Sequence, residues 1–267
     1  SAKFLDLAGG AHIPIGIGVP TSNATGALYG WAADYPLSAY RGGIHEDGID
    51  AMRQVVDTSG NQTVVIIEIG PHTNAQRLME RFPYTQQKIR VVIMGGSVAP
   101  GIRLPWGHVT PVNTTNERKD PAAAHAIVRG LWAQPPIFAP VDTSYQVVLR
   151  GMLWQQVLQS TDPVLQLLLQ CYRYWWQESR RDPLAITHKE AMSLDPERES
   201  AILFDTEAVH LSVATSYFLL TELQVDFTDC GHTLVLPPSS SSGGPAQMAL
   251  NWTQGPRSGL KAFLQHL

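Results

Sequence analysis

The sequence predicts an α/β fold in which a mainly parallel β-sheet is flanked by helices. Three observations lead to this class. Short apolar runs bounded by turn residues alternate with longer segments of helical periodicity. The apolar runs are continuous and rich in β-branched residues, which is typical of strands buried on both faces. The second half of the chain is expected to be more helical than the first.

The first half is expected to repeat a strand-then-helix step three times. Two of the strands end at glycine turns, one at Gly70-Pro71 and the other at Gly95-Gly96. One helix has a clear start, because Asp120 can cap its amide groups and Pro121 suits its first position. The predicted ranges are 64–69, 91–94 and 137–141 for strands, and 1–10, 73–81 and the segment after residue 120 for helices.

Helices are expected to dominate the second half. Apolar residues recur at intervals of three and four in the segments 147–158, 163–177 and 206–220. The charged segment 178–199 contains two Asp-Pro pairs and is expected to form a surface loop or a short helix. The remaining predictions are a small hairpin at 224–236, a linker at 237–245 and a closing helix at 259–267.

Composition excludes two classes of protein. The chain has 267 residues and is expected to form a single domain over residues 1–267. Its net charge is −4 and its 19 Lys and Arg residues are scattered, so we expect no nucleic acid as a partner. No apolar run approaches the roughly 20 residues that cross a bilayer, so we also expect no membrane span.

The cysteines and asparagines bear on the cellular compartment. Cys171 and Cys230 lie in no metal-ligand or redox spacing, so buried thiols are favoured over a disulfide. The localisation stays open: the cytoplasm is slightly favoured, whereas the Asn-x-Thr glycosylation motifs fit a secretory route. These motifs begin at Asn23, Asn61, Asn113 and Asn251.

Chemistry is expected at the turns that follow the strands, because open α/β sheets bind ligands beyond the carboxyl ends of their strands. The turn from Gly70 to Asn74 is one candidate, although it also fits a simple strand-to-helix turn. The second candidate is Gly95-Gly96-Ser97, which opens a long irregular stretch that reaches Asn116. A loop of that length within a compact domain is often functional.

At these residues the chain resembles the inosine-uridine preferring nucleoside hydrolases. The resemblance covers essentially residues 1–267 in order, and its specificity comes from the order and spacing of several pieces together. These pieces are Ala2-Lys3-Phe4-Leu5-Asp6-Leu7-Ala8-Gly9, His45-Glu46-Asp47-Gly48, Ile69-Gly70-Pro71-His72-Thr73-Asn74, Met94-Gly95-Gly96-Ser97, Asn116 with Asp120-Pro121-Ala122-Ala123, and Leu203-Phe204-Asp205-Thr206-Glu207-Ala208-Val209.

The resemblance implies a Rossmann-like fold and a calcium-dependent hydrolysis of the N-glycosidic bond of purine and pyrimidine ribonucleosides. Calcium, a hard cation with oxygen ligands, would hold the ribose hydroxyls and the attacking water. A small ribonucleoside is the implied ligand, and a homo-oligomer is possible by analogy with relatives.

The resemblance also assigns residues to the implied site. The metal ligands would be the His72 backbone carbonyl and the Asp205 carboxylate, and Asn116 would bond the ribose. The alternative role for Asp205 is to cap the amide groups at the start of its helix. His45 would touch the nucleobase, or it is a loop histidine without a role. No catalytic residue is assigned.

The chain departs from the family pattern at two kinds of position. It begins after the family's Asp-x-Asp-x-x-x-Asp-Asp motif, so we expect the first central strand to be missing and calcium binding to be weak at best. Thr114 stands where relatives carry a glutamate next to the ribose, and Phe204 where many carry a histidine. These departures predict impaired hydrolysis.

Two function hypotheses remain after this comparison. The first is a nucleoside hydrolase whose activity is impaired in this chain. The alternative is a catalytically inactive relative, a pseudoenzyme that acts as a binding or structural protein. A Ser-His-Asp hydrolase is discounted, because the sequence contains no Gly-x-Ser-x-Gly nucleophile motif.

Overall fold

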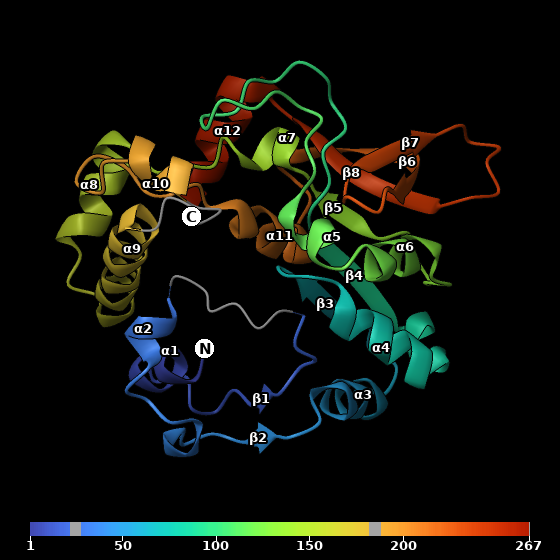
Figure 1. Cartoon of the computed structure of the whole chain (residues 1–267), viewed down its shortest axis with the longest axis horizontal. Coiled ribbons are helices and arrows are strands. Elements are labelled where there is room, and N and C mark those ends of the chain that lie inside the picture. Colours follow the sequence, from blue (N-terminus) through green and yellow to red (C-terminus); the bar gives the residue numbers. More distant parts are fainter. Residues whose placement is uncertain (22–27, 182–187, 267) are drawn as a thin grey trace. The chain divides into compact units, whose positions relative to one another are not determined.

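The computed structural model describes residues 1–21, 28–181 and 188–266, and Figure 1 shows its helices and strands along the chain. Its internal contacts group the residues into two compact units. The first, called the small unit here, contains residues 1–17, 22–48 and 148–201. The second, called the sheet unit, contains residues 18–21, 49–147 and 202–267. The single domain over residues 1–267 stays a prediction.

The sheet unit is built on a six-stranded sheet with the strand order β3-β4-β5-β8-β6-β7. In that order the strands span Val64–Glu68, Ile89–Met94, Ile137–Ala139, Gly244–Trp252, Phe218–Phe227 and Thr233–Leu236. β3, β4, β5 and β8 run parallel, whereas β6 is antiparallel to both of its neighbours. The sheet is therefore mixed, and the prediction of a mainly parallel sheet is wrong, because the β6–β7 hairpin joins the same sheet through β8.

Helices cover both faces of this sheet. On β4, Val91 and Ile93 pack into one core cluster, whereas Val92 and Met94 pack into another, as alternating side chains of a buried strand require. The first face is covered by α3 (Gly48–Thr58), α4 (Thr73–Arg81) and α6 (Pro121–Arg129). The second face is covered by α7 (Val141–Ser144), α11 (Phe204–Val213) and α12 (Gly255–His266).

Local sequence signals explain where two of these helices begin and end. α4 has the predicted bounds, 73–81, and is followed by the 3-10 helix η2, Pro83–Lys88. α6 begins as predicted, because the Asp120 carboxylate accepts a hydrogen bond of 3.1 Å from the Ala123 amide and Pro121 opens the helix.

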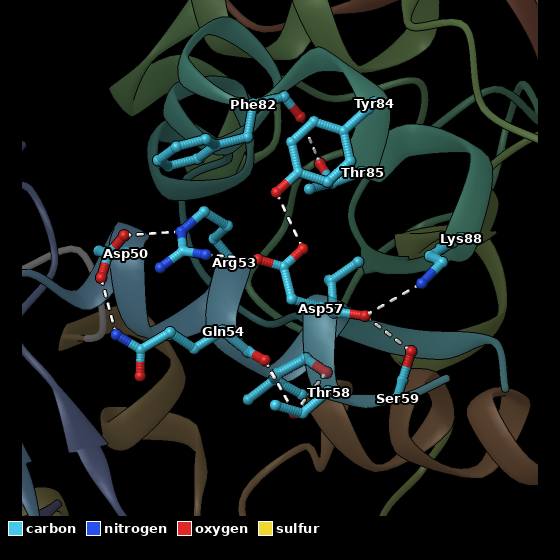
Figure 2. A network of polar contacts seen from close by, with 12 residues as sticks. Asp50, Arg53, Gln54, Asp57, Thr58, Ser59, Phe82, Tyr84, Thr85 and Lys88 are labelled. Atoms are coloured by element: carbon cyan, nitrogen blue, oxygen red, sulfur yellow. Dashed lines mark hydrogen bonds and ion pairs between the residues drawn. The ribbon is translucent and has the colours of Figure 1, made fainter. Parts of the chain in front are cut away.

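A network of ion pairs and hydrogen bonds on the surface connects α3 to η2 (Figure 2). The Arg53 guanidinium pairs with the carboxylates of Asp50 and Asp57 on the same helix, and its Nε lies 2.7 Å from Asp50 Oδ1. The Tyr84 hydroxyl donates to Asp57 Oδ1 over 2.9 Å, which joins the two elements. Exposed pairs of this kind contribute little stability each.

The C-terminal part of the sheet unit differs most from prediction. The expected helix 206–220 ends at Val213, and β6 begins at Phe218, because residues 218–225 pair with β8. β8 was not predicted, and its first two residues fall in the segment that was predicted as a linker. The hairpin 224–236 is confirmed as β6 and β7. The closing helix begins at Gly255 instead of Gly259, and its predicted end, Leu267, lies outside the described residues.

The small unit is mainly helical. Its longest helix, α9 (Pro163–Arg181), carries Tyr172. The Tyr172 ring packs edge-on against Trp154 at 5.7 Å, and its hydroxyl donates to the Glu199 carbonyl over 3.1 Å. Residues 182–187, which belong to the predicted surface segment 178–199, lie outside the described residues. The elements are α1 (Ala2–Leu7), β1 (Ile15–Gly16), α2 (Tyr29–Ala32), η1 (Leu37–Ala39), β2 (Ile44–His45), α8 (Gly151–Gln159), α9 (Pro163–Arg181) and α10 (His188–Ser193), with β1 and β2 parallel.

Three sequence predictions concern exposure and the membrane. Both cysteines are free, but Cys171 is half-buried and Cys230 is exposed, so the expectation of buried thiols is wrong. Asn61, Asn113 and Asn251 are exposed, whereas Asn23 lies outside the described residues. Among the helices described, none is long and apolar enough to span a membrane.

Candidate functional site

Asn116 lies beside the carboxyl end of β4. It belongs to α5 (Thr115–Lys119), and its side-chain Nδ2 donates a hydrogen bond of 2.9 Å to the carbonyl of Met94, the last residue of β4. This bond fixes the orientation of the amide group. Its Oδ1 accepts no hydrogen bond from the described residues, so it remains available to a ligand.

Asp205 lies at the same edge, in the first turn of α11. The amide of Leu203 donates to the Val147 carbonyl beyond β5 over 2.8 Å, and the Phe204 ring meets Trp106, in the loop after β4, at 6.0 Å. At the other end of α11, the Ser212 carbonyl accepts a bond from Arg90, near the start of β4. The amino end of α11 therefore lies at the carboxyl edge of the sheet.

The environment of Asp205 does not support the capping interpretation. The N-cap position of α11 is Leu203, and the Asp205 carboxylate forms no hydrogen bond or ion pair with the described part of the chain. The residue is exposed, yet the surrounding protein desolvates its carboxyl group and raises its pKa. An unpartnered carboxylate at a ligand-binding edge is available to a cation or a hydroxyl group.

His72 occupies the turn after β3, with its backbone committed to the next helix. Its carbonyl accepts a hydrogen bond of 2.9 Å from the Gln76 amide, as the first bond of α4. Its ring is buried between two glutamates: Nδ1 contacts Glu68 Oε2, and Nε2 lies 3.6 Å from Glu117 Oε1. Burial alone would lower the pKa of His72, but the two carboxylates outweigh it and raise the pKa to about 10.

Thr114 is buried at the start of α5 and is tied to Glu117. Its hydroxyl donates to Glu117 Oε2, and its backbone carbonyl accepts from the Arg118 amide over 3.0 Å. Sequence reasoning missed Glu117. The spacing Thr114-x-x-Glu117 is that of a capping box, which is the signal that could have identified the pair.

Two further buried carboxyl groups, one on α7 after β5 and one on α11, were also missed. Asp142, at the start of α7, accepts hydrogen bonds from the amides of Val98 at 3.1 Å and Ala99 at 2.5 Å, and it so holds the loop after β4. Glu207, on α11, contacts the Thr143 hydroxyl at 2.8 Å. Burial raises the pKa of both carboxyl groups, and the charge of Asp142 adds to the increase at Glu207.

The structure brings four of the five predicted site residues into one unit. His72, Thr114, Asn116 and Asp205 lie in the sheet unit, whereas His45 lies in β2 of the small unit. For His72, Thr114 and Asn116, which follow β3 and β4, the order of strands explains this grouping, since parallel strands that are neighbours in a sheet end at the same edge.

The described side chains do not fit the implied calcium ion. Calcium takes six to eight oxygen ligands. Within residues 1–21, 28–181 and 188–266, no three His, Cys, Asp or Glu side chains lie close enough together to hold a metal. Asp205 is a single carboxylate, and the His72 carbonyl already accepts a helical hydrogen bond.

Comparison with known proteins identifies relatives. The family described as inosine-uridine preferring nucleoside hydrolase matches residues 2–252. A plant nucleoside hydrolase is similar in structure, with a TM-score of 0.70, 19% identity and coverage of 98% of this chain and 82% of the other. An inosine-guanosine nucleoside hydrolase has a TM-score of 0.70 at 13% identity, covering 98% and 83%. A purine-preferring ribonucleoside hydrolase from Gardnerella vaginalis has a TM-score of 0.66 at 18% identity, covering 97% and 81%. A search of curated proteins found no match.

Proposed function

Because the chain belongs to the inosine-uridine preferring nucleoside hydrolase family, we propose that it binds ribonucleosides and that its site serves the hydrolysis of their N-glycosidic bond to free base and ribose. The observation that carries this proposal is the placement of Asn116 and Asp205 at the same edge of the sheet, where its parallel strands have their carboxyl ends. Each has a side-chain oxygen without a partner among the described residues.

These two side chains suit different parts of a ribonucleoside. The amide of Asn116 is already oriented by its bond to Met94, so its Oδ1 accepts a ribose hydroxyl without further ordering. The Asp205 carboxylate is the proposed metal ligand. Because the described donor set is too small for calcium, we propose that a site with useful affinity needs carboxylates from a further segment.

The free edge of β3 supports such a segment. β3 is the outermost strand of the sheet and pairs with β4 alone among the described strands. Val65 and Ile67 are 37% and 38% exposed, and the strand contains none of the Lys or Pro residues that commonly protect an edge. We propose that one more parallel strand pairs here, and that its carboxyl end brings acidic side chains to the site.

The donor set also favours a second function, that of a non-catalytic nucleoside-binding relative. Thr114 donates its hydroxyl to Glu117 and supplies no carboxylate of its own. Of the two proposed ligand contacts, Asn116 and Asp205, only Asp205 is a carboxylate. The described residues can therefore bind a nucleoside without hydrolysing it.

A strand-addition experiment distinguishes the two functions. The chain is extended at its N-terminus by a strand of β-branched residues that ends in an aspartate cluster, and free base released from inosine and uridine is measured with and without calcium. For a hydrolase, we expect release to rise at least about a hundredfold over the unextended chain and to fall at least about tenfold in Asn116→Ala and Asp205→Asn.

Two controls accompany this experiment. The same extension with asparagines in place of aspartates should leave the activity low. Asp57→Asn, on α3 before the start of β3, should behave as the unmodified extended chain. If the added strand slows hydrogen exchange of β3 but no base is released, the non-catalytic function is the correct one.

A further inference from the structure

The end of the β6–β7 hairpin lies against the segment that carries Asn116. The turn of this hairpin spans residues 228–232, in the C-terminal part of the sheet unit. Its Gly231 carbonyl accepts a hydrogen bond of 3.3 Å from the Thr114 amide. Two parts of the chain that are distant in the sequence are therefore joined two residues before Asn116.

The close approach of this turn to α5 requires a glycine at position 231. Gly231 has a φ of +80°, in the left-handed region that other residues rarely adopt. A Cβ there would lie 2.5 Å from the Arg118 amide nitrogen and 2.7 Å from the Arg118 Cα. Both are backbone atoms of α5, so a change of side-chain rotamer cannot relieve the clash. A larger residue would push the turn away from α5.

A second bond from the hairpin holds the beginning of the loop after β4. The Thr233 hydroxyl oxygen accepts a hydrogen bond of 3.1 Å from the Ser97 amide, and both residues are buried. The Ser97 hydroxyl in turn accepts a hydrogen bond of 3.1 Å from the Val112 amide, near the end of the same loop. Loss of the Thr233 hydroxyl would leave the buried Ser97 amide without this acceptor, which is costly.

The hairpin end has supports of its own. Within the turn, the Gly231 amide donates to the Thr228 carbonyl over 2.8 Å. At the end of β6, the Asp226 carboxylate lies 2.6 Å from His125 Nδ1 and also pairs with Arg129, and both of these residues belong to α6. Because these bonds do not involve the loop after β4, the hairpin can act as a fixed support for that loop.

The segment 112–116 is held at three points. They are the Val112 amide, the Thr114 amide and the Asn116 side chain. The hairpin supplies the partner of the second point directly and supports the first through Ser97. The third point is the bond to the last residue of β4. The placement of Asn116 therefore depends on the hairpin as well as on β4.

We propose that Gly231 and Thr233 are positioning residues of the nucleoside site, which hold Asn116 in place through the segment 112–116. The inference rests on the proposed function, because Asn116 is the proposed ribose contact. The two hydrogen bonds from the hairpin do not require a ligand, so they can be measured without one.

Inosine affinity separates a positioning role from a merely structural one. Thr233→Val keeps the size of the side chain but removes the hydroxyl. We expect the dissociation constant for inosine to rise at least about tenfold in protein that is still folded, as judged by circular dichroism. Thr233→Ser keeps the hydroxyl and should bind inosine as the unmodified protein does.

Thr85→Val is the matched control for this series. Thr85 lies in η2 and is also buried, and its hydroxyl donates to the Phe82 carbonyl over 2.7 Å. Its loss should lower the stability of the protein but leave the inosine affinity unchanged.

The second test follows the segment itself by NMR, without a ligand. In Gly231→Ala, the Thr114 amide should exchange its hydrogen at least about tenfold faster. The side-chain amide signal of Asn116, assigned by its loss in Asn116→Ala, should move. Gly60→Ala is the control for backbone strain, because Gly60 has a φ of +61° but a Cβ there meets nothing within 4 Å in the described structure. It should change neither signal.

The outcomes separate the two proposals. If the unmodified protein binds no inosine, the proposed function fails, and the Thr114 exchange and the Asn116 signal still decide the positioning role. If Thr233→Val and Gly231→Ala lose stability but keep the inosine affinity and the Asn116 signal, the hairpin is only structural and the positioning role is overturned.

Discussion

The hydroxyl of Thr143 shows which form Glu207 takes. It lies 2.8 Å from both the Ala249 carbonyl and Glu207 Oε1. A hydroxyl has one proton to donate, and a carbonyl can only accept. The hydroxyl therefore donates to Ala249, and Glu207 must contribute its own proton to the second bond. This agrees with a pKa raised by complete burial.

A pH-dependent stability follows from this proton. The unfolded chain releases it near the ordinary value of 4.5, whereas the folded chain retains it. The contribution of Glu207 to stability is therefore complete below that pH and falls as the pH rises towards the folded pKa, by at most about 1.4 kcal/mol per pH unit. Glu207→Gln should remove this loss.

Urea unfolding at about pH 5 and about pH 8 provides the measurement. The free energy of unfolding of Glu207→Gln, relative to the unmodified protein, should increase between the two pH values. A difference that stays constant with pH would show that Glu207 is ionised in the folded state.

Gly95 and Gly70 offer a matched steric test at two neighbouring turns. A Cβ at Gly95 would lie 1.9 Å from Glu117 Oε1, whereas at Gly70 nothing lies within 4 Å. Glu117 is completely buried, and its other carboxylate oxygen accepts the Thr114 hydroxyl, so moving it would break that bond. We therefore expect Gly95→Ala to lower the free energy of unfolding by about 1–3 kcal/mol and Gly70→Ala to change it little. Equal effects in urea denaturation would contradict the observed packing.

The sequence suggested some candidate site residues and missed others for a physical reason. Asn116 and Asp205 were assigned through the resemblance to the family, and their roles stay predictions. Glu68, Glu117 and Glu207 were missed because burial of a glutamate depends on contacts between distant segments. The His72 side chain was overlooked for the same reason, since its partners lie on two other elements.

At the scale of single elements, β3 makes the sharpest prediction. Its outer edge has no partner strand in the described structure, so half of its amides should face solvent and the other half should bond to β4. Hydrogen exchange should therefore alternate along residues 64–68, while Val92 and Ile93 of β4, which pair with both β3 and β5, exchange slowly. Uniform protection of β3 would mean that its edge is already covered.

The elements that were predicted well are those with local signals. α6 has a capping residue, Asp120, and β3 and β4 are apolar runs followed closely by glycines. The failures lie where tertiary pairing decides the outcome. Residues 218–220 carry a helical pattern but form β6, since they pair with β8, and β8 contains a proline at Pro245 that weakens its strand signal.

At the scale of the whole molecule, the family match over residues 2–252 joins the separate observations. The loop after β4 and the start of α11 lie at the edge where the parallel strands have their carboxyl ends. The mixed order of the sheet could not be read from the sequence, because β8 follows β6 and β7 in the chain yet lies between β5 and β6 in space. Such an order depends on long-range pairing that local patterns do not contain.

The central claim is the proposal that Asn116 contacts the ribose, that Asp205 is a metal ligand, and that the described residues supply too few carboxylates to bind calcium. Calorimetric titration of calcium into the purified chain, paired with an assay for ribose released from inosine and uridine, tests it most directly. We predict a dissociation constant no tighter than about millimolar and little or no ribose release. Micromolar calcium binding together with ribose release, both lost in Asp205→Ala, would contradict the claim.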